Sequence, residues 1–127
     1  MRIAVVLPVL NEAACLEQAL SALTREQHFD EIIVVDGGSA DASAEIVCKF
    51  MSAAMPDRHA VPALIESAGG RAMQMHAGAQ ASGADVLLFL HADCTLPPGA
   101  ADDIREVIES GRLWGRFDVR LTGRNFM

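Results

Sequence analysis

Short aliphatic runs alternate along this chain with longer segments in which apolar residues recur every three or four positions. Aliphatic runs of this kind are typical of strands buried on both faces of a parallel sheet. They predict strands at Arg2–Leu7, Glu31–Asp36, Val61–Ser67 and Val86–Leu90. The periodic segments predict a helix after each strand. These are a helix with Leu16, Leu20 and Leu23 on one face, helices near Ala42–Met51 and Ala72–Ala81, and a fourth that follows Pro97-Pro98-Gly99 and ends near Glu109.

A fifth strand is predicted at Trp114–Leu121, where apolar and polar residues alternate as they do in an edge strand. Strands that alternate with helices indicate an α/β fold, here a three-layer α/β/α, Rossmann-like arrangement around a mostly parallel sheet. Right-handed crossovers place the loops that follow the strands at one edge of such a sheet. We therefore expect Pro8–Asn11, Asp36–Gly38 and His91–Asp93 to lie together at the edge where open α/β sheets bind ligands.

The composition is that of an acidic, folded domain. The chain has 127 residues, of which 51% are hydrophobic, and this is enough for one domain with its own core. The formal net charge is −7 and the isoelectric point is about 4.9, so the chain lacks the basic footprint that nonspecific nucleic-acid binding needs. We expect no nucleic-acid partner, and an anionic substrate would need local positive charge from a metal ion or an arginine.

Cysteine usage and hydropathy bear on the location of the protein. Cys15, Cys48 and Cys94 match no zinc-binding spacing, and their odd number favours reduced thiols in a cytoplasmic protein. No run approaches the ~20 apolar residues of a transmembrane helix. We expect a cytoplasmic protein that could be peripheral to the inner membrane through a partner, a lipid-linked substrate or sequence missing from this chain.

Two acidic strand ends are the first candidates for chemistry. Asp36, followed by Gly37 and Gly38, could accept hydrogen bonds from a nucleobase or ribose, with the glycines letting the ligand approach; it could equally cap the next helix. His91 and Asp93 are two residues apart, so in extended backbone they point the same way and could reach one Mg²⁺ or Mn²⁺. The alternative is a packed histidine beside a turn aspartate.

Residues at two predicted helix starts are further candidates. Arg71 follows Gly69-Gly70 and could contact a phosphate, or it could be a solvated surface residue. Asn11 is predicted to cap the helix after the first strand. Gln74 lies on the same predicted helix as Arg71 and could either support a site or lie at the surface.

Taken together, these segments resemble the family 2 inverting glycosyltransferases of the GT-A fold. The similarity rests on Val6–Glu12, Ile32–Asp41 and Gly83–Asp93. Within the family, the chain resembles a bacterial subgroup with the motifs G-R-A-x-Q-M and F-L-H-A-D, which here are Gly70–Met75 and Phe89–Asp93. The resemblance covers essentially the whole chain in the right order, so it is more specific than any single motif.

The resemblance implies a donor site for a nucleotide-diphosphate sugar. It places Pro8, Asn11 and Glu12 in the loop beside the nucleotide, Asp36 and Gly37 at the base, and Arg71 near the base and diphosphate. Asp93 matches the last acid of the D-x-D metal motif, with His91 in place of the first acid, and would help hold a divalent ion, Mg²⁺ or Mn²⁺, on the diphosphate. An acceptor hydroxyl would then attack with inversion, aided by a carboxylate base.

The resemblance also implies that the domain is incomplete. Family members continue into an acceptor-binding region that carries the general base, and no residue up to Met127 matches that base. We therefore expect residues 1–127 to form a single nucleotide-sugar-binding domain, a GT-A fold incomplete at its C-terminus. A sheet cut short would expose a strand edge, so we predict self-association through that edge. The acceptor stays open, and a lipid-linked acceptor is one alternative.

Two other functions remain as alternatives. A nucleotidyltransferase would have a similar fold, but it would carry a glycine-rich, basic loop after the first strand, which Pro8–Glu12 lacks. A non-catalytic, receiver-like module would need an acidic pair after the first strand and a lysine after the fifth. The chain has only Glu12 in the first position, and its single lysine is Lys49.

Overall fold

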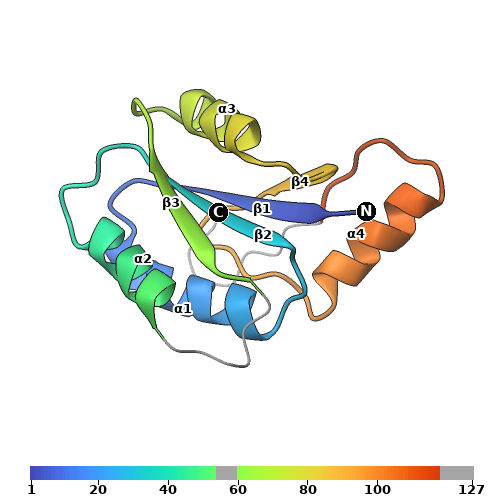
Figure 1. The fold of residues 1–127 in the computed structure, drawn as a ribbon, viewed down its shortest axis with the longest axis horizontal. Helices are drawn as coiled ribbons and strands as arrows, with labels where there is room; N and C mark the ends of the chain where they lie inside the picture. Colours follow the sequence, from blue (N-terminus) through green and yellow to red (C-terminus); the bar gives the residue numbers. More distant parts are fainter. Residues whose placement is uncertain (54–59, 118–127) are drawn as a thin grey trace, which may run out of the picture.

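The computed structural model describes residues 1–53 and 60–117 of the chain. Strands and helices alternate in the order that the sequence predicts (Figure 1). The strands are β1 (Ile3–Val9), β2 (Glu31–Asp36), β3 (Pro62–Glu66) and β4 (Val86–Phe89). The helices are α1 (Ala13–Arg25), α2 (Ser43–Ser52), α3 (Arg71–Ala81) and α4 (Ala100–Glu109).

The four strands form one parallel sheet in the order β3-β2-β1-β4. This confirms the predicted parallel sheet and places β1 and β2 at its centre. The register aligns Val9 with Asp36 and Asp36 with Glu66, so β1, β2 and β3 end together at one edge. Loops that leave this carboxyl edge are where an open α/β sheet builds a ligand site.

Strand β1 continues two residues beyond its predicted end and includes Pro8. Even-numbered residues of β1 bond toward β4, since Val6 O accepts from Leu90 N at 3.0 Å. Pro8 has the same orientation, but the pairing of β1 with β4 stops at Val6 and Phe89. The proline therefore lies past the end of the β1–β4 pairing, where no strand-to-strand hydrogen bond would need its N–H.

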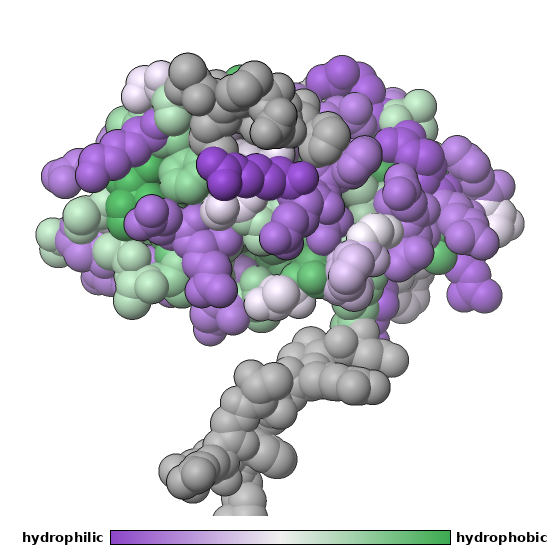
Figure 2. All heavy atoms as spheres, turned by 90° about the horizontal axis from the view of Figure 1, so that it is seen from below, coloured by the Kyte–Doolittle hydropathy of each residue, from purple (hydrophilic) through white to green (hydrophobic). Residues whose placement is uncertain are grey.

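Helices cover both faces of the sheet, as the three-layer prediction requires (Figure 1). One face carries the larger core, in which the odd-numbered side chains of β1 pack with Leu16, Leu20 and Leu23 of α1. Val47 of α2 and Ala101 of α4 belong to the same core. The face of α1 and α2 turned to solvent is mostly hydrophilic, with apolar patches between the polar side chains (Figure 2).

Helix α3 lies on the opposite face of the sheet and packs unusually close to it. Val6, Ile33 and Val35 form the buried core beneath this helix. A Cβ atom at Gly78 would overlap Val6 Cγ1 and would lie 3.1 Å from Val35 Cγ2. Only a glycine at this position lets α3 sit at its observed height over β1 and β2, a requirement that the sequence analysis did not identify.

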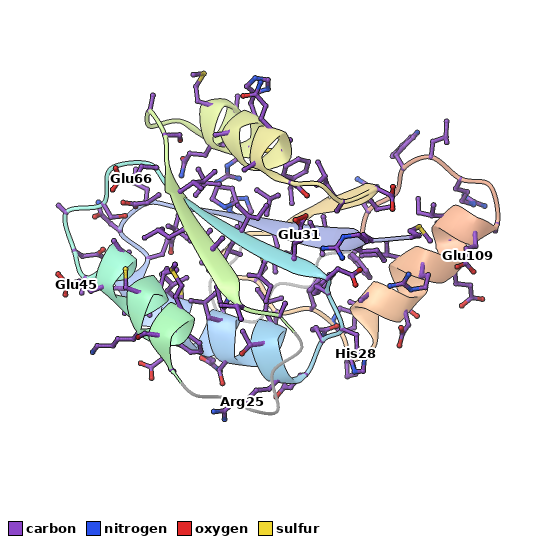
Figure 3. All side chains as sticks on the ribbon, viewed as in Figure 1. Arg25, His28, Glu31, Glu45, Glu66 and Glu109 are labelled. Atoms are coloured by element: carbon purple, nitrogen blue, oxygen red, sulfur yellow. The ribbon has the colours of Figure 1, made fainter. Side chains whose placement is uncertain are left out.

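The C-terminal end of α3 is fixed by a carboxylate from the start of β2. Glu31 accepts hydrogen bonds from Ser82 Oγ at 2.6 Å and from Gly83 N at 3.2 Å (Figure 3). Such bonds hold the chain where it leaves the helix and turns toward β4. Both ends of α3 are therefore tied to the sheet, since its first turn is held at the carboxyl edge as described below.

The predicted fifth strand is wrong for the part of it that the structure describes. Residues 114–117 lie in no strand, and residues 118–121 fall outside the described residues. A strand needs a neighbour for its backbone groups; the described sheet ends at β4, and Trp114 is 81% exposed. Across the described residues, none of the helices has the length and apolar character needed to cross a membrane.

Candidate functional site

The loops after β1 and β2 meet at the carboxyl edge of the sheet, as predicted. Gly37 N donates to Val9 O at 3.0 Å, so the chain leaving β2 is still bonded to the end of β1. Ser67 N donates to Asp36 O at 3.0 Å, which ties the end of β3 to the same point. Three strand ends are thus held in register where the candidate residues begin.

Asp36 is a buried carboxylate at the end of β2, with only 6% of its surface exposed. Its Oδ1 accepts hydrogen bonds from Ser39 Oγ at 2.5 Å and from Ser39 N at 3.2 Å. Its Oδ2 receives only a longer contact, 3.4 Å from Ser39 N. The bonds to its own loop compensate for the loss of water around the charge, and Oδ2 keeps acceptor capacity for a further donor.

Ser39 joins the loop after β2 to the loop after β1. Its Oγ donates to Asp36 and accepts a hydrogen bond from Asn11 N at 2.9 Å. Asn11 in turn accepts a hydrogen bond from Ala40 N through its Oδ1, at 2.8 Å. Asn11 and Asp36, both predicted to bind the nucleotide, are therefore parts of one hydrogen-bonded unit.

The prediction that Asn11 caps α1 is wrong. Glu12 occupies the N-cap position, without a side-chain cap bond, while Asn11 has a φ of 53° and uses its side chain on Ala40. The left-handed backbone turns the Asn11 side chain toward the second loop rather than toward its own helix, and asparagine tolerates that conformation better than most residues.

Asp41 serves the starts of α1 and α2 together. Its Oδ2 accepts from Ala13 N at 3.1 Å, and its Oδ1 accepts from Ser43 N at 2.9 Å. A carboxylate is favoured there because the first backbone N–H groups of a helix are unpaired and carry partial positive charge. The hydrogen bonds from Ser43, with a smaller one from Ala13, lower the pKa of Asp41 below its ordinary value.

Gln74 is buried beneath the site and holds two strands at once. Its side chain is on the first turns of α3 and is 4% exposed. Nε2 donates to Val9 O at 2.9 Å and to Val35 O at 3.0 Å. From the sequence, Gln74 could either support a site or lie at the surface. Its spacing of three and four residues from Ala77 and Gly78 was the signal that places it on the sheet-facing side.

Arg71 and His91 contact each other across the site. Arg71 is the first residue of α3, and its Nη1 contacts Nε2 of His91, just after β4. Arginine can only donate, so Nε2 of His91 is the acceptor in this contact. The predicted phosphate contact and one predicted metal ligand are therefore neighbours, on either side of the carboxyl edge.

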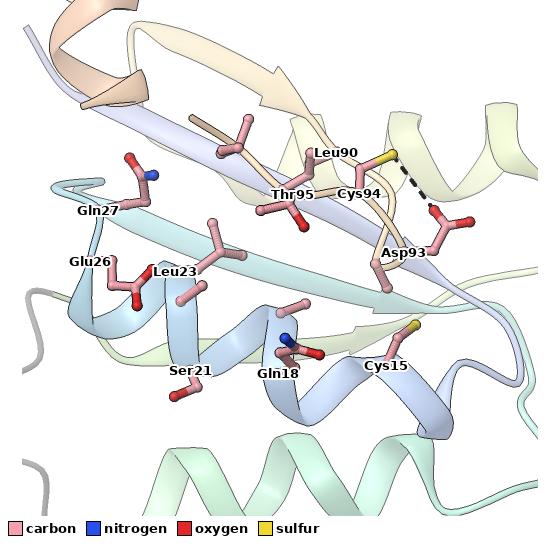
Figure 4. Close-up of a pocket in the computed structure, with 14 residues that line it drawn as sticks. Cys15, Gln18, Ser21, Leu23, Glu26, Gln27, Leu90, Asp93, Cys94 and Thr95 are labelled. Atoms are coloured by element: carbon pink, nitrogen blue, oxygen red, sulfur yellow. Dashed lines mark hydrogen bonds between the residues drawn. The ribbon is translucent and has the colours of Figure 1, made fainter. Parts of the chain in front are cut away.

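Asp93 lies exposed on the turn after β4, beside a cavity of about 270 Å³ between α1 and residues 90–96 (Figure 4). Cys94 Sγ is 3.6 Å from Asp93 Oδ1, and Cys15 Sγ is 3.4 Å from Glu12 Oε2. Burial raises the pKa of both thiols, and the nearby carboxylates raise it further, Asp93 for Cys94 and Glu12 for Cys15. The two thiols are thus held protonated and are poor nucleophiles.

The donor set fits an ion shared with a ligand better than one held by protein alone. Within residues 1–53 and 60–117, no three His, Cys, Asp or Glu side chains are grouped to hold a metal ion. Mg²⁺ is commonly bound by one or two carboxylates together with substrate phosphates, and Asp93 could be one such carboxylate. His91 could ligate through Nε2 only if Arg71 moved away, because Arg71 occupies that lone pair.

Comparison with solved structures identifies the fold. The chain superposes on S. aureus TarS 1-349, crystallised with UDP-GlcNAc, with a TM-score of 0.69 and 22% identity over 87% of this chain and 32% of that one. A mannosyltransferase, PcManGT from Pyrobaculum calidifontis, crystallised with GDP-Man and Mn²⁺, gives a TM-score of 0.67 and 23% identity over 85% and 31%. These are GT-A structures, so the predicted fold class is confirmed.

Comparison with known sequences identifies the family. The chain is 34% identical to an undecaprenyl-phosphate 4-deoxy-4-formamido-L-arabinose transferase of Pectobacterium carotovorum subsp. carotovorum over 111 residues. The match covers 84% of this chain and 32% of that enzyme, so the chain spans about a third of the length of the curated relative. The family model described as "Glycosyl transferase family 2" matches residues 4–127. The resemblance inferred from the motifs is therefore confirmed, and the chain belongs to glycosyl transferase family 2.

Proposed function

We propose that this chain forms the donor-binding part of an inverting glycosyltransferase that uses a nucleotide-diphosphate sugar. The observation that carries the proposal is the buried carboxylate of Asp36 at the carboxyl edge of a parallel sheet. Its Oδ2 has acceptor capacity left, and a nucleobase or ribose has donors to fill it. Relatives and structural neighbours named for sugar transfer or crystallised with nucleotide sugars support this assignment.

The nucleoside would lie against the two joined loops. Asp36 would accept a hydrogen bond from the base or ribose, with Gly37 beside it. Pro8, at the end of β1, and Asn11 and Glu12, after it, would line the other side. Because Ser39 ties Asn11 to Asp36, the two sides would keep a fixed separation before the ligand arrives, and preorganisation of this kind lowers the cost of binding.

The diphosphate would lie between α3 and the turn after β4. Arg71 supplies positive charge between α3 and the turn after β4, and its guanidinium can bind phosphate oxygens. Asp93, together with His91, would hold a Mg²⁺ or Mn²⁺ ion. When bound, such an ion supplies charge neutralisation for the leaving nucleotide diphosphate. Arg71 would exchange its contact with His91 for a phosphate, which leaves the histidine ring nitrogen available.

The acceptor side is proposed from the relatives alone. The Pectobacterium relative is named for an undecaprenyl-phosphate substrate, so we propose a lipid-linked acceptor and a location at the cytoplasmic face of the inner membrane. The acceptor oxygen, either a hydroxyl or a lipid-phosphate oxygen, would attack opposite the leaving group, and only a hydroxyl would need a carboxylate base to take its proton. No observation on the described residues favours a nucleotidyltransferase or a receiver-like module.

A thermal-shift screen against UDP, GDP, CDP and dTDP, each with and without Mn²⁺ or Mg²⁺, tests the donor site. A ligand that binds only the folded chain raises its melting temperature by mass action. We expect one nucleotide to raise it, and expect Asp36→Asn to abolish that rise. Asp102→Asn, a matched change in the first turn of α4, should leave it intact. No rise with any nucleotide, or equal effects of the two variants, would refute the assignment.

A further inference from the structure

We propose that Gln74 is a positioning residue for the nucleotide end of the site, and that Gly37 is a glycine because the Gln74 amide occupies the space of its side chain. The inference rests on the proposed donor site, since the loops that Gln74 holds are those expected to bind the nucleoside. It gives Gly37 a different role from letting a ligand approach the backbone.

Gln74 uses both of its amide hydrogens on the ends of neighbouring strands. Val9 is the last residue of β1, and Val35 is the residue before Asp36 at the end of β2. The two bonds, of 2.9 Å and 3.0 Å, therefore cross-link the points from which the Asn11 loop and the Asp36 loop depart. The side chain is 4% exposed, so water has little access to replace either bond if the amide is lost or displaced.

Gly37 lies directly against this amide. A Cβ atom built at Gly37 would stand 2.8 Å from Gln74 Cδ, 2.9 Å from Nε2 and 3.0 Å from Oε1. Gly37 is not among the glycines with positive φ, so its backbone conformation does not itself require glycine. The requirement for glycine at this position is steric, and it comes from Gln74.

Gly38, the next residue, is glycine for the opposite reason. Its φ is 101°, a conformation that side-chain-bearing residues rarely adopt. A Cβ atom there would meet no described atom within 4 Å. The adjacent residues Gly37 and Gly38 therefore need to be glycine for different reasons, steric at Gly37 and conformational at Gly38. Gly38 is a matched control for Gly37.

An alanine at Gly37 would push the Gln74 amide aside and break its two bonds. The loops carrying Asn11 and Asp36 would then lose an anchor that they share, although the Asn11 and Asp36 side chains themselves are unchanged. In a chain that already lacks the amide, the same alanine has nothing to displace. The proposal thus predicts that the effects of Gly37→Ala and Gln74→Ala are not additive.

The test is a double-mutant cycle on the 127-residue chain, with Gly37→Ala, Gln74→Ala and the double variant. The affinities for UDP and for GDP, with Mn²⁺, are measured by calorimetry well below the melting temperature. We expect each single variant to weaken the better nucleotide by about ten-fold, as loss of buried hydrogen bonds implies. The double variant should match Gln74→Ala, whereas Gly38→Ala should keep its full effect in the Gln74→Ala background.

Gln74→Met separates hydrogen bonding from packing, because methionine has a similar length and no donor. We expect it to weaken nucleotide binding as Gln74→Ala does. Nucleotide affinity retained in Gln74→Met, or additive effects of Gly37→Ala and Gln74→Ala, would overturn the positioning role.

The cycle also separates this inference from the donor-site proposal on which it rests. If the unmodified chain binds none of UDP, GDP, CDP and dTDP, the donor site fails. Unfolding free energies and the NMR shifts of the Asn11 and Ser39 amides then still report whether Gly37 and Gln74 are coupled. Additive unfolding free energies, with unchanged amide shifts in both variants, would refute the coupling independently.

Discussion

The Oγ of Ser39 lies 2.5 Å from Oδ1 of Asp36, to which it donates, and this Oγ also accepts a hydrogen bond from the backbone N–H of Asn11. One small side chain therefore determines how the buried acid is satisfied and where the neighbouring loop lies. The sequence motif D-G-G-S places Ser39 three residues after Asp36, a spacing that suits a local turn bond. The structure adds the long-range bond to Asn11, which links two loops 28 positions apart.

Removal of the Ser39 hydroxyl should weaken both stability and nucleotide binding. Ser39→Ala leaves Asp36 Oδ1 and Asn11 N each without this partner, which we expect to lower the free energy of unfolding by about 1–3 kcal/mol. Urea unfolding and calorimetric titration with UDP or GDP measure the two effects. The control is Ser52→Ala, because Ser52 is exposed at the end of α2 and, among the described residues, its hydroxyl bonds only within that helix. A Ser39→Ala chain as stable as the control would contradict the linking role.

Asp41 should make stability depend on pH in the acid range. Its pKa is lowered in the folded state, chiefly by the hydrogen bond from Ser43. The stabilisation is therefore fully present above the ordinary value of 3.8 and is lost as the pH falls through the lower folded value. Asp41→Asn cannot titrate, so its urea midpoint should fall less steeply below that pH than the midpoint of the unmodified chain. Parallel pH profiles of the two chains would refute the prediction.

Cys15 and Cys94 should react slowly with alkylating reagents. Burial and neighbouring carboxylates raise the pKa of both thiols above the ordinary value of 9.0, and only the thiolate reacts. Cys48, which is exposed like Cys94, serves as the internal comparison, and Cys15 is half-buried. With iodoacetamide at neutral pH, peptide mass spectrometry should find Cys48 modified first. In a pH series, the alkylation rates at Cys15 and Cys94 should still increase with pH above pH 9.0. Equal rates at all three residues would contradict this picture.

Gly78 should tolerate alanine much less well than Gly83. The added methyl at Gly78 must push α3 away from Val6, and overpacking of this kind costs about 1–3 kcal/mol. Around Gly83, no described atom lies within 4 Å of a built Cβ, so Gly83→Ala should be nearly neutral. Urea unfolding of the two variants compares the costs, and similar costs would mean that α3 can adjust its height over the sheet.

Self-association through the outer edge of β4 stays a prediction. Among the described residues, β4 pairs with β1 on one side only, and Phe89 at its end is 40% exposed. Exposed strand edges pair readily with other chains. Analytical ultracentrifugation across a range of concentrations should show a dimer whose population falls in Phe89→Lys. A monomer at every concentration would rule out the edge contact.

The sequence predicted the strand order along the chain and the edge at which the candidate residues meet, because burial on both faces leaves an uninterrupted aliphatic signature. Asp36, Asn11, Arg71 and His91 do come to that edge. The sequence could not predict their partners. The bond that Ala40 N donates to Asn11 and the contact of Arg71 with His91 depend on how segments distant in the sequence approach each other in space, and local spacing does not encode that approach.

Residues that act from beneath the site were harder to recognise than those within it. Gln74 reads as a surface residue by polarity, and its role depends on two backbone carbonyls that have no sequence signature. Gly78 was overlooked because a glycine inside a helix usually signals only weak helix propensity. The fifth strand was mispredicted for a related reason. Alternation shows that a segment could pair, while pairing itself needs a neighbouring strand at the right place.

The close seating of α3 on the sheet has a mechanical consequence. Gly78 and the ties at both helix ends hold this helix against the sheet, so the backbones of Arg71 and Gln74, three residues apart, shift together whenever the helix moves. A displacement of α3 would shift Arg71 at the diphosphate end and Gln74 at the nucleoside end at the same time. Binding of the nucleoside and binding of the diphosphate would then be coupled through one turn of α3.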